Sequence, residues 1–549
     1  MTRATGAHLL ARTLRAHGID RIFGLCGDHV NGLLDACAQE GLAFVGTRHE
    51  SGATHMADAW ARVTGRPGVS VVTGGPGHSN SLTGIGAAWL AGSPLIAISG
   101  SAPSNRTDMG VPQDIDQVAM VQPITKWARC VHRPERLGWY AAEAYRRALS
   151  GRPGPVHLSV PHDVLEAQLD PRLTICTPKT RVPAAASPDG VDQVVALLAQ
   201  AERPALIAGG GVYWSRAWEA LQQVVEHTGV PCFTTRMGRG CLPDEHPLCF
   251  GDASVTNNPL ARDLGKADLV LIVGRPIDSG LAYGELFSES ATLVHVGTAS
   301  AQLGAHRAHA LVLSSDERAF LDQLVHAIGA LEPARFASWV QELRTHQVAL
   351  EATIVAPTGP QVHPRQVVEA LREALPADAT LVFDGGDFTQ FCRAGLRARR
   401  PGHWLRHGPY GSIGASIPFA VAAKLARPHS PVVAMIGDGA MGFHSWELHT
   451  AIRQGLSLVI VVGNNGVWGM ERAIQHAHYG RTVGTELGAL RYDRIVAAMG
   501  GHGERVASAE QVRPALERAL ERSTVSCIDI AIEPVPGPLT ESKLTRRAR

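Results

Sequence analysis

The chain contains 549 residues, of which 45% are hydrophobic and 18% are charged, and its formal net charge is +1. This length predicts three or four domains rather than one. The near-zero net charge excludes a field that would attract nucleic acid or acidic membranes.

From its cysteine usage and hydropathy pattern we expect this chain to have neither a targeting segment nor a membrane span. The nine cysteines are scattered without a CxxC pair, which is typical of reduced thiols in a cytoplasmic protein. Residues 1–20 read as an amphipathic helix that lacks the apolar core of a secretory signal. The most apolar stretch, at 85–98, is interrupted by Gly92, Ser93 and Pro94, so we expect no membrane span.

Two proline-rich segments, near 170–189 and 352–364, divide the chain into three pieces of ordinary domain size. We predict an N-terminal domain over 1–175, a central domain over 188–350 and a C-terminal domain over 360–549. In every piece, helical patterns alternate with apolar runs typical of buried strands, which lie at 21–23, 43–45, 69–72, 95–98, 156–160, 204–208, 269–273, 292–296, 380–383, 432–436, 458–462 and 527–532. This alternation predicts an α/β fold of three doubly wound parallel-sheet domains.

The N-terminal piece contains a carboxylate at the start of a predicted helix. Glu50 begins a predicted helix that has one apolar face. The predicted strand 69–72, which comes after this helix, is followed by the glycine-rich turn 74–77 and by Asn80. A carboxylate at this place can simply cap the helix, because it gains from the helix dipole. In the central piece, Gly209–Gly211 follows a strand, but no acidic residue stands at dinucleotide-fingerprint spacing. It is therefore interpreted as a tight connection.

The C-terminal piece contains the most specific pattern. The predicted strands 432–436 and 458–462 flank a predicted helix at 445–454, so Asp438 and Asn465 should lie together at the carboxyl ends of neighbouring strands. Oxygen ligands in this arrangement suit magnesium, which usually takes one or two protein ligands plus phosphates. Gly439 and Ala440 then open a helix whose free N–H groups suit a diphosphate. The pattern predicts a magnesium diphosphate anchor.

The GDG turn and the later NN pair resemble the diphosphate motif of thiamine diphosphate (ThDP) enzymes. The order RHE, TGGPG and SG in the N-terminal piece resembles the pyrimidine-binding domain of ThDP-dependent decarboxylases and carboligases. This resemblance implies that Asp438, Asn465 and the Val467 carbonyl hold Mg²⁺. It also implies that Glu50 activates the cofactor and that Ile413 folds it into a V. The implied cofactor-binding residues are Glu50, Gly385, Gly411, Ile413, Gly439, Ala440, Val467, Trp468, Gly469 and Met470.

Within this superfamily the chain is most similar to benzaldehyde lyases, through FGLCGDH at 23–29, RHGPYGSIG at 406–414 and NNGVWG at 464–469. The similarity implies that His29, Gln113 and His407 line the pocket over the reactive carbon, although His29 as a structural loop histidine is the alternative. It also implies a C–C lyase or carboligase that acts on aldehydes, acyloins or 2-oxo acids through a carbanion–enamine. A homodimer or homotetramer with active sites at subunit interfaces is implied as well.

Departures from these patterns keep other reactions open. Met470 and Thr389 differ from the benzaldehyde lyase pattern, and Pro112 and Ser279 differ from the acetolactate synthase pattern. The Ser279 change removes an arginine, so FAD is not expected. Acetolactate-synthase-like carboligation of pyruvate is the second interpretation, and a 2-hydroxyacyl-CoA lyase or oxalyl-CoA decarboxylase is the third. The alternative that is not an enzyme is a ThDP-binding scaffold without catalytic turnover. The presence of Glu50, which catalysis requires, argues against it.

Overall fold

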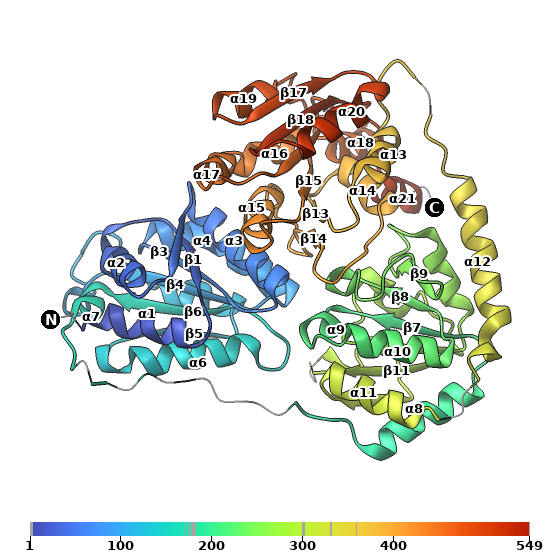
Figure 1. The fold of residues 1–549 in the computed structure, drawn as a ribbon, viewed down its shortest axis with the longest axis horizontal. Coiled ribbons are helices and arrows are strands. Elements are labelled where there is room, and N and C mark those ends of the chain that lie inside the picture. Colours follow the sequence, from blue (N-terminus) through green and yellow to red (C-terminus); the bar gives the residue numbers. More distant parts are fainter. Residues whose placement is uncertain are drawn as a thin grey trace.

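The computed structural model of this chain describes residues 4–170, 172–173, 175, 177, 183–298, 302–329, 332–357 and 359–547. Much of the first predicted linker therefore lies outside the described residues. The described chain forms three six-stranded sheets, and all of their strand pairings are parallel (Figure 1). Helices flank each sheet, and the predicted α/β fold with three parallel-sheet domains is confirmed.

The N-terminal sheet has the strand order β2-β1-β3-β4-β6-β5. Its central strands are buried along their whole length, as expected where helices cover both faces of a parallel sheet. The strands are β1 (Arg21–Gly24), β2 (Ala43–Gly46), β3 (Gly68–Val72), β4 (Leu95–Ser101), β5 (Trp127–Cys130) and β6 (Val156–Pro161). The helices are α1 (Gly6–Ala16), α2 (Asn31–Gln39), α3 (Glu50–Thr64), α4 (Pro76–Ala91), α5 (Gln117–Val121), α6 (Leu137–Leu149) and α7 (His162–Glu166).

The central sheet has the order β12-β11-β10-β7-β8-β9. Successive strands are added outwards from β7 on one side and from β10 on the other, so the strand order reverses between these two neighbours. The strands are β7 (Pro204–Ala208), β8 (Cys232–Thr234), β9 (Cys249–Asp252), β10 (Leu269–Val273), β11 (Thr292–Gly297) and β12 (Leu311–Ser314). The helices are α8 (Pro188–Gln200), α9 (Gly210–Trp214), α10 (Trp218–Thr228), α11 (Glu317–Ala327) and α12 (Ala337–Ala352). In Figure 1, α12 runs along the outer edge of this domain towards the C-terminal domain.

The C-terminal sheet, β14-β13-β15-β16-β18-β17, repeats the strand order of the N-terminal sheet. Its strands are β13 (Thr380–Phe383), β14 (Trp404–Arg406), β15 (Val432–Gly437), β16 (Val459–Asn464), β17 (His502–Val506) and β18 (Ser526–Ala531). The helices are α13 (Pro364–Ala374), α14 (Asp387–Gly395), α15 (Ser416–Ala426), α16 (Asp438–His444), α17 (Glu447–Arg453), α18 (Gly469–Tyr479), α19 (Tyr492–Ala498), α20 (Ala509–Leu520) and α21 (Pro538–Arg547).

Helix α3 joins the N-terminal domain to the C-terminal domain. Only its last residue, Thr64, is not buried, and it packs along α15, which lies between the two domains in Figure 1. One apolar cluster consequently contains residues of both domains, from Phe23 and Met56 to Ile417 and Phe419. Within this contact Arg62 forms a buried ion pair with Asp58, and its Nη1 donates to the Arg406 carbonyl at 2.8 Å.

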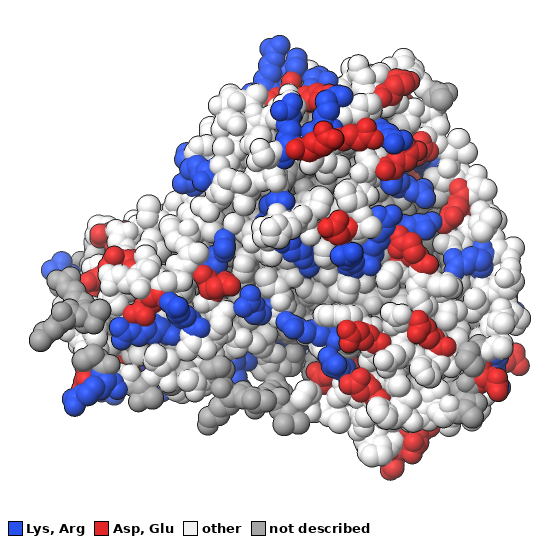
Figure 2. Space-filling model, viewed as in Figure 1, with Lys and Arg blue, Asp and Glu red and all other residues white. Residues whose placement is uncertain are grey.

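Among the described residues, no helix is both long and apolar enough to span a membrane. On the face shown in Figure 2, basic and acidic side chains are interspersed, without a continuous basic area.

Candidate active site

Glu50 is the first residue of α3 and is only 8% exposed. Its Oε2 accepts a hydrogen bond of 3.0 Å from Nδ2 of Asn80 on α4. A Cβ atom added to Gly77 would lie 3.5 Å from Glu50 Oε1, so the turn after β3 passes close to the carboxyl group. The helix itself is capped by the His49 side chain, which accepts from the Ser51 N–H. Glu50 is therefore not needed as the capping residue.

His29 and Gln113 contact the same turn after β3. His29 Nδ1 lies 3.1 Å from Thr73 Oγ1 and accepts from the Gly74 N–H at 3.4 Å, so Nε2 carries the proton of the neutral ring. Burial lowers the pKa of His29 and favours this neutral form. Gln113 has a left-handed backbone with φ of 67°, and its Cβ would lie 2.7 Å from a Cβ on Gly75. Three predicted residues thus meet at one turn.

Asp438 and Asn465 lie at the same edge of the C-terminal sheet. Strands β15 and β16 are paired with Gly437 opposite Gly463, and each residue follows its strand. Asp438 Oδ2 accepts from the Gly466 N–H at 2.7 Å, and Asn465 Oδ1 accepts from the Val467 N–H at 3.1 Å. The juxtaposition expected from the strand pattern is observed.

This edge of the sheet fits a magnesium diphosphate. A Cβ atom added to Gly437 or Gly411 would meet no other heavy atom within 4 Å, so the backbone there faces open space. Burial raises the pKa of Asp438 to about 6, and a divalent cation would favour its charged form. The described residues include no cluster of three or more His, Cys, Asp or Glu that could bind a metal. Magnesium does not require one when phosphates supply ligands.

The other predicted cofactor residues surround Asp438. Ala440 is buried in α16, and the Trp468 ring packs on Gly439, where an added Cβ would lie 2.4 Å from the ring. Gly469 begins α18 and is followed by the partly buried Met470. The predicted single helix over 445–454 is wrong in extent, because α16 and α17 are separate helices that break at Ser445 and Trp446.

Gly385, Ile413 and His407 lie together beside this edge. A Cβ atom added to Gly385 would lie 3.0 Å from Ile413 Cγ2 and 3.6 Å from His407 Cε1. Burial, together with the positive charge of Arg406, lowers the pKa of His407 to about 3, so its imidazole is neutral at physiological pH. Among the described residues, the buried His407 Nδ1 has no hydrogen-bond partner.

Sequence reasoning missed the residue that holds the Ile413 turn. Asp384 is fully buried, and it accepts from the Gly414 N–H at 2.9 Å and from the Ser416 N–H at 3.0 Å. The signal was an acidic residue directly after the strand 380–383. Thr389, noted as a departure from the benzaldehyde lyase pattern, is also fully buried, and its hydroxyl donates to the Asp384 carbonyl at 2.8 Å.

Side chains that follow Glu50 connect its helix to the C-terminal domain. Ser51 Oγ lies 3.0 Å from His444 Nε2, and His55 Nε2 lies 3.1 Å from Ser412 Oγ. Glu447 accepts from the backbone N–H groups of Arg48 and His49. The hydrogen bond of Glu50 itself stays within the N-terminal domain.

A cavity of about 560 Å³ adjoins the predicted cofactor loop. It is lined by Val467 and Gly469 from that loop and by the basic side chains of Arg472, His476 and Arg481. Arg472 Nε lies 3.7 Å from Glu486 Oε1, which is beyond hydrogen-bond distance, so this ion pair is weak. The cavity is therefore suited to a substrate that carries an anionic group.

The glycine turn of the central domain has an acidic partner that sequence spacing did not reveal. Gly209–Gly211 forms the predicted connection between β7 and α9. The Glu317 carboxyl lies against it, since a Cβ on Gly211 would be 2.3 Å from Oε1. Burial raises the pKa of Glu317 to about 7. This residue comes from α11, about a hundred positions further along the chain.

The N-terminal and C-terminal sheets have the same strand order, and each presents predicted cofactor residues at its carboxyl edge. Family models agree: the thiamine pyrophosphate enzyme N-terminal, central and C-terminal domains match residues 4–120, 191–324 and 384–530. The acetolactate synthase large subunit of Mycobacterium tuberculosis is 36% identical over 96% of this chain and 95% of that protein. The chain belongs to the thiamine pyrophosphate enzymes.

Other relatives carry different names. Human 2-hydroxyacyl-CoA lyase 2 is 30% identical over 91% of this chain and 84% of that protein. Sulfoacetaldehyde acetyltransferase of Castellaniella defragrans is 30% identical over 94% of this chain and 90% of that protein. These names support a ThDP-dependent lyase or carboligase. The predicted similarity to benzaldehyde lyases stays a prediction.

Replacing Asp438 by Ala should weaken ThDP binding in the presence of Mg²⁺ about tenfold or more, because the variant lacks the predicted metal ligand. Isothermal titration with ThDP, with and without EDTA, measures the change. Asp378→Ala is the control, since Asp378 precedes β13 at the opposite edge of the sheet. Wild-type affinity in the Asp438 variant would show that the metal lies elsewhere.

Proposed function

We propose that this chain is a ThDP- and Mg²⁺-dependent enzyme that forms or breaks a C–C bond next to a carbonyl group. The observation that carries the proposal is the two-part arrangement of Glu50 on one sheet edge and Asp438 with Asn465 on the other. Asp438, Asn465 and the Val467 carbonyl would bind the metal. Gly385, Gly439, Ala440, Trp468, Gly469 and Met470 would line the site of the diphosphate and the thiazolium ring.

The remaining residues have separate tasks. Glu50 would hold a proton at the N1′ atom of the pyrimidine, while the Gly411 carbonyl orients its amino group and Ile413 supports the bend. His29 Nε2–H and the Gln113 amide would donate to an oxygen that becomes negative, and neutral His407 stands beside Ile413. Bound ThDP would supply the nucleophilic carbon and the electron sink.

The first candidate reaction is decarboxylating carboligation of a 2-oxo acid. Its support is the basic cavity next to Val467, lined by Arg472, His476 and Arg481, which suits a carboxylate. The names of the relatives support an anionic substrate, because acetolactate, sulfoacetaldehyde and an acyl-CoA all carry anionic groups, and the acetolactate synthase is the relative that favours a 2-oxo acid.

Acyloin cleavage or ligation of the benzaldehyde lyase type is the second candidate, supported by the motifs at 23–29 and 406–414. A 2-hydroxyacyl-CoA lyase is the third, since its CoA phosphates would also suit the basic cavity. No flavin is included in the proposal. Arg275 in the central domain is already paired with Asp278, through Nη1 at 2.9 Å, and Ser279 follows.

We also propose a homodimer or homotetramer in which each site combines Glu50 of one subunit with Asp438 of another. Exposed apolar side chains support it on both halves of the site. They are Met109, Ile115 and Met120 in the N-terminal domain and Tyr410, Phe443 and Trp446 in the C-terminal domain. Such exposure is typical of a surface that a partner covers.

Glu50→Gln should lower kcat by at least about a hundredfold, because the amide cannot hold the N1′ proton, while ThDP binding stays within a few-fold. Steady-state kinetics and a ThDP titration separate the two effects. The matched control is Glu471→Gln, because Glu471 is an exposed carboxylate in the first turn of α18, next to the predicted cofactor loop. Undiminished turnover in the Glu50 variant would overturn the assignment.

At a ThDP concentration too low to load the Asp438→Ala protein, mixing the Glu50→Gln and Asp438→Ala proteins should restore activity, if each site draws on two subunits. Random exchange between dimers gives half mixed dimers with one intact site each, or about a quarter of wild-type activity. Activity is measured after mild dissociation and reassociation. No recovery in verified mixed dimers would contradict shared sites.

Product analysis distinguishes the three reactions. The protein with ThDP and Mg²⁺ is incubated separately with pyruvate, benzoin, acetoin and a 2-hydroxyacyl-CoA, and products are identified by mass spectrometry. We expect CO₂ release and a carboligation product from a 2-oxo acid, with KM raised about tenfold by Arg472→Ala. Benzoin cleavage without 2-oxo acid turnover would favour the second candidate.

A further inference from the structure

A cavity of about 340 Å³ lies where all three domains meet. The end of α3 at Val63, Thr64 and the capping Gly65 forms one wall, and the central and C-terminal domains form the others. The side chains that characterise the cavity are those of Arg216, Arg400, Arg427, Tyr213, Trp218 and His403. It is separate from the predicted cofactor site, which lies at the opposite, amino end of α3.

The charges around this cavity are all of one sign. Its lining includes three arginines and no aspartate or glutamate. Arg427 donates only to neutral oxygens: the Gly402 carbonyl at 2.9 Å, Thr380 Oγ1 at 3.1 Å and the Val63 carbonyl at 3.2 Å. In the part of the chain that the structure describes, the Arg216 and Arg400 side chains form no hydrogen bond or ion pair.

Neighbouring groups respond to this positive charge. Burial, and then the charges of Arg427 and Arg400, lower the pKa of His403 to about 4. Burial likewise lowers the pKa of Arg427 to about 10, and Arg400 contributes to this shift by repulsion. An anion in the cavity would relieve both repulsions.

Arg216 occupies a backbone position at which glycine is usual. Its φ is 54°, and it follows the C-cap Ser215 of α9, with hydrogen bonds from the Arg216 N–H to the Tyr213 carbonyl and from the Ala217 N–H to the Val212 carbonyl. A side chain in this left-handed conformation is less stable than glycine would be. The strain at Arg216 therefore raises the question of what its side chain binds.

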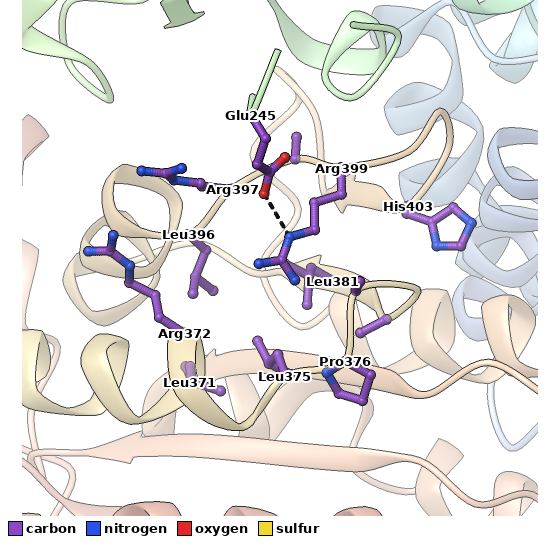
Figure 3. A pocket seen from close by; sticks show the side chains of 13 residues that line it. Glu245, Leu371, Arg372, Leu375, Pro376, Leu381, Leu396, Arg397, Arg399 and His403 are labelled. Atoms are coloured by element: carbon purple, nitrogen blue, oxygen red, sulfur yellow. Dashed lines mark hydrogen bonds and ion pairs between the residues drawn. The ribbon is translucent and has the colours of Figure 1, made fainter. Parts of the chain in front are cut away.

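The neighbouring cavity provides a contrast (Figure 3). His403 lines both cavities, and Arg397 and Arg399 of the same segment face the second one. There Arg399 Nε is paired with Glu245 at 2.8 Å, as the dashed line in Figure 3 shows, above a floor of leucines. Its positive charge is therefore partly neutralised, whereas that of the three-domain cavity is not.

Neutralising helix ends does not account for all three arginines. The carboxyl ends of α3 and α15 carry partial negative charge, and Arg427 already donates to the last turn of α3. Among the described residues, the side chains of Arg216 and Arg400 have no acceptor. The aromatic rings of Tyr213 and Trp218, with centroids 6.2 Å apart, leave an apolar wall beside them.

We propose that the cavity at the junction of the three domains binds a small phosphate ester. The planar guanidinium groups of Arg216 and Arg400 match two oxygens of a phosphate group, and Arg427 adds a third positive charge. The organic part of the ester lies against Tyr213 and Trp218, because the volume exceeds that of inorganic phosphate. Binding at this place links the ends of α3 and α15.

The test is isothermal titration of ThDP-loaded protein with phenyl phosphate, with phenylacetate as the carboxylate of similar size. We expect one saturable site for phenyl phosphate that Arg400→Ala weakens about tenfold or more. Arg397→Ala, three positions away and facing the other cavity, should leave it unchanged. Equal binding of phenylacetate, or no saturable site, would overturn the proposal.

Arg216→Gly separates binding from folding. Glycine relieves the left-handed strain, so thermal unfolding should occur at an equal or higher temperature, while phenyl phosphate affinity falls about tenfold or more. Unchanged affinity in both Arg216→Gly and Arg400→Ala would show that the arginines serve only the structure. Higher salt should weaken binding to wild type, because the attraction is between exposed charges.

Discussion

The packing of α3 against α15 is the constraint on which the site depends. Helix α3 is buried along almost its whole length, and it begins with Glu50; the turn that precedes α15 contains Ile413. Arg62, which is paired with Asp58 of the same helix, lies 4.9 Å from the centre of the Phe419 ring of α15 and donates to the Arg406 carbonyl, so a shift of α3 against the C-terminal domain would remove both contacts from a buried charge. The positions of the carboxylate and the hydrophobic support are therefore set by the same interface.

Polar contacts at the amino end of α3 complete this constraint. His444 and Ser412 of the C-terminal domain bond Ser51 and His55, one helical turn apart. Within the subunit they connect the helix of Glu50 to elements that we assign to the cofactor of another site. If sites are shared between subunits, each chain contributes to two of them, and α3 is the physical link between the two.

Much of the fold and the metal edge could be predicted, because the signals are local. All strands predicted from apolar runs were observed, whereas β5, β8, β9, β12, β14 and β17 were missed. Several of these are short or carry polar residues, such as β14 with three residues and β17 with His502 and Glu504. Asp438 and Asn465 were predictable because adjacent parallel strands end together. Asp384, Thr73 and Glu447 were not, since their partners are 30 to 399 positions away.

The apolar cores divide the molecule differently from its sheets. One cluster unites the N-terminal and C-terminal domains through α3 and α15, while the clusters around β7 and β10 belong to the central domain alone. Cooperative unfolding follows shared cores rather than strand counts. The N-terminal and C-terminal domains also have a separate cluster each, but we expect the shared one to make them unfold together, so that both halves of the proposed cofactor site are lost in one transition.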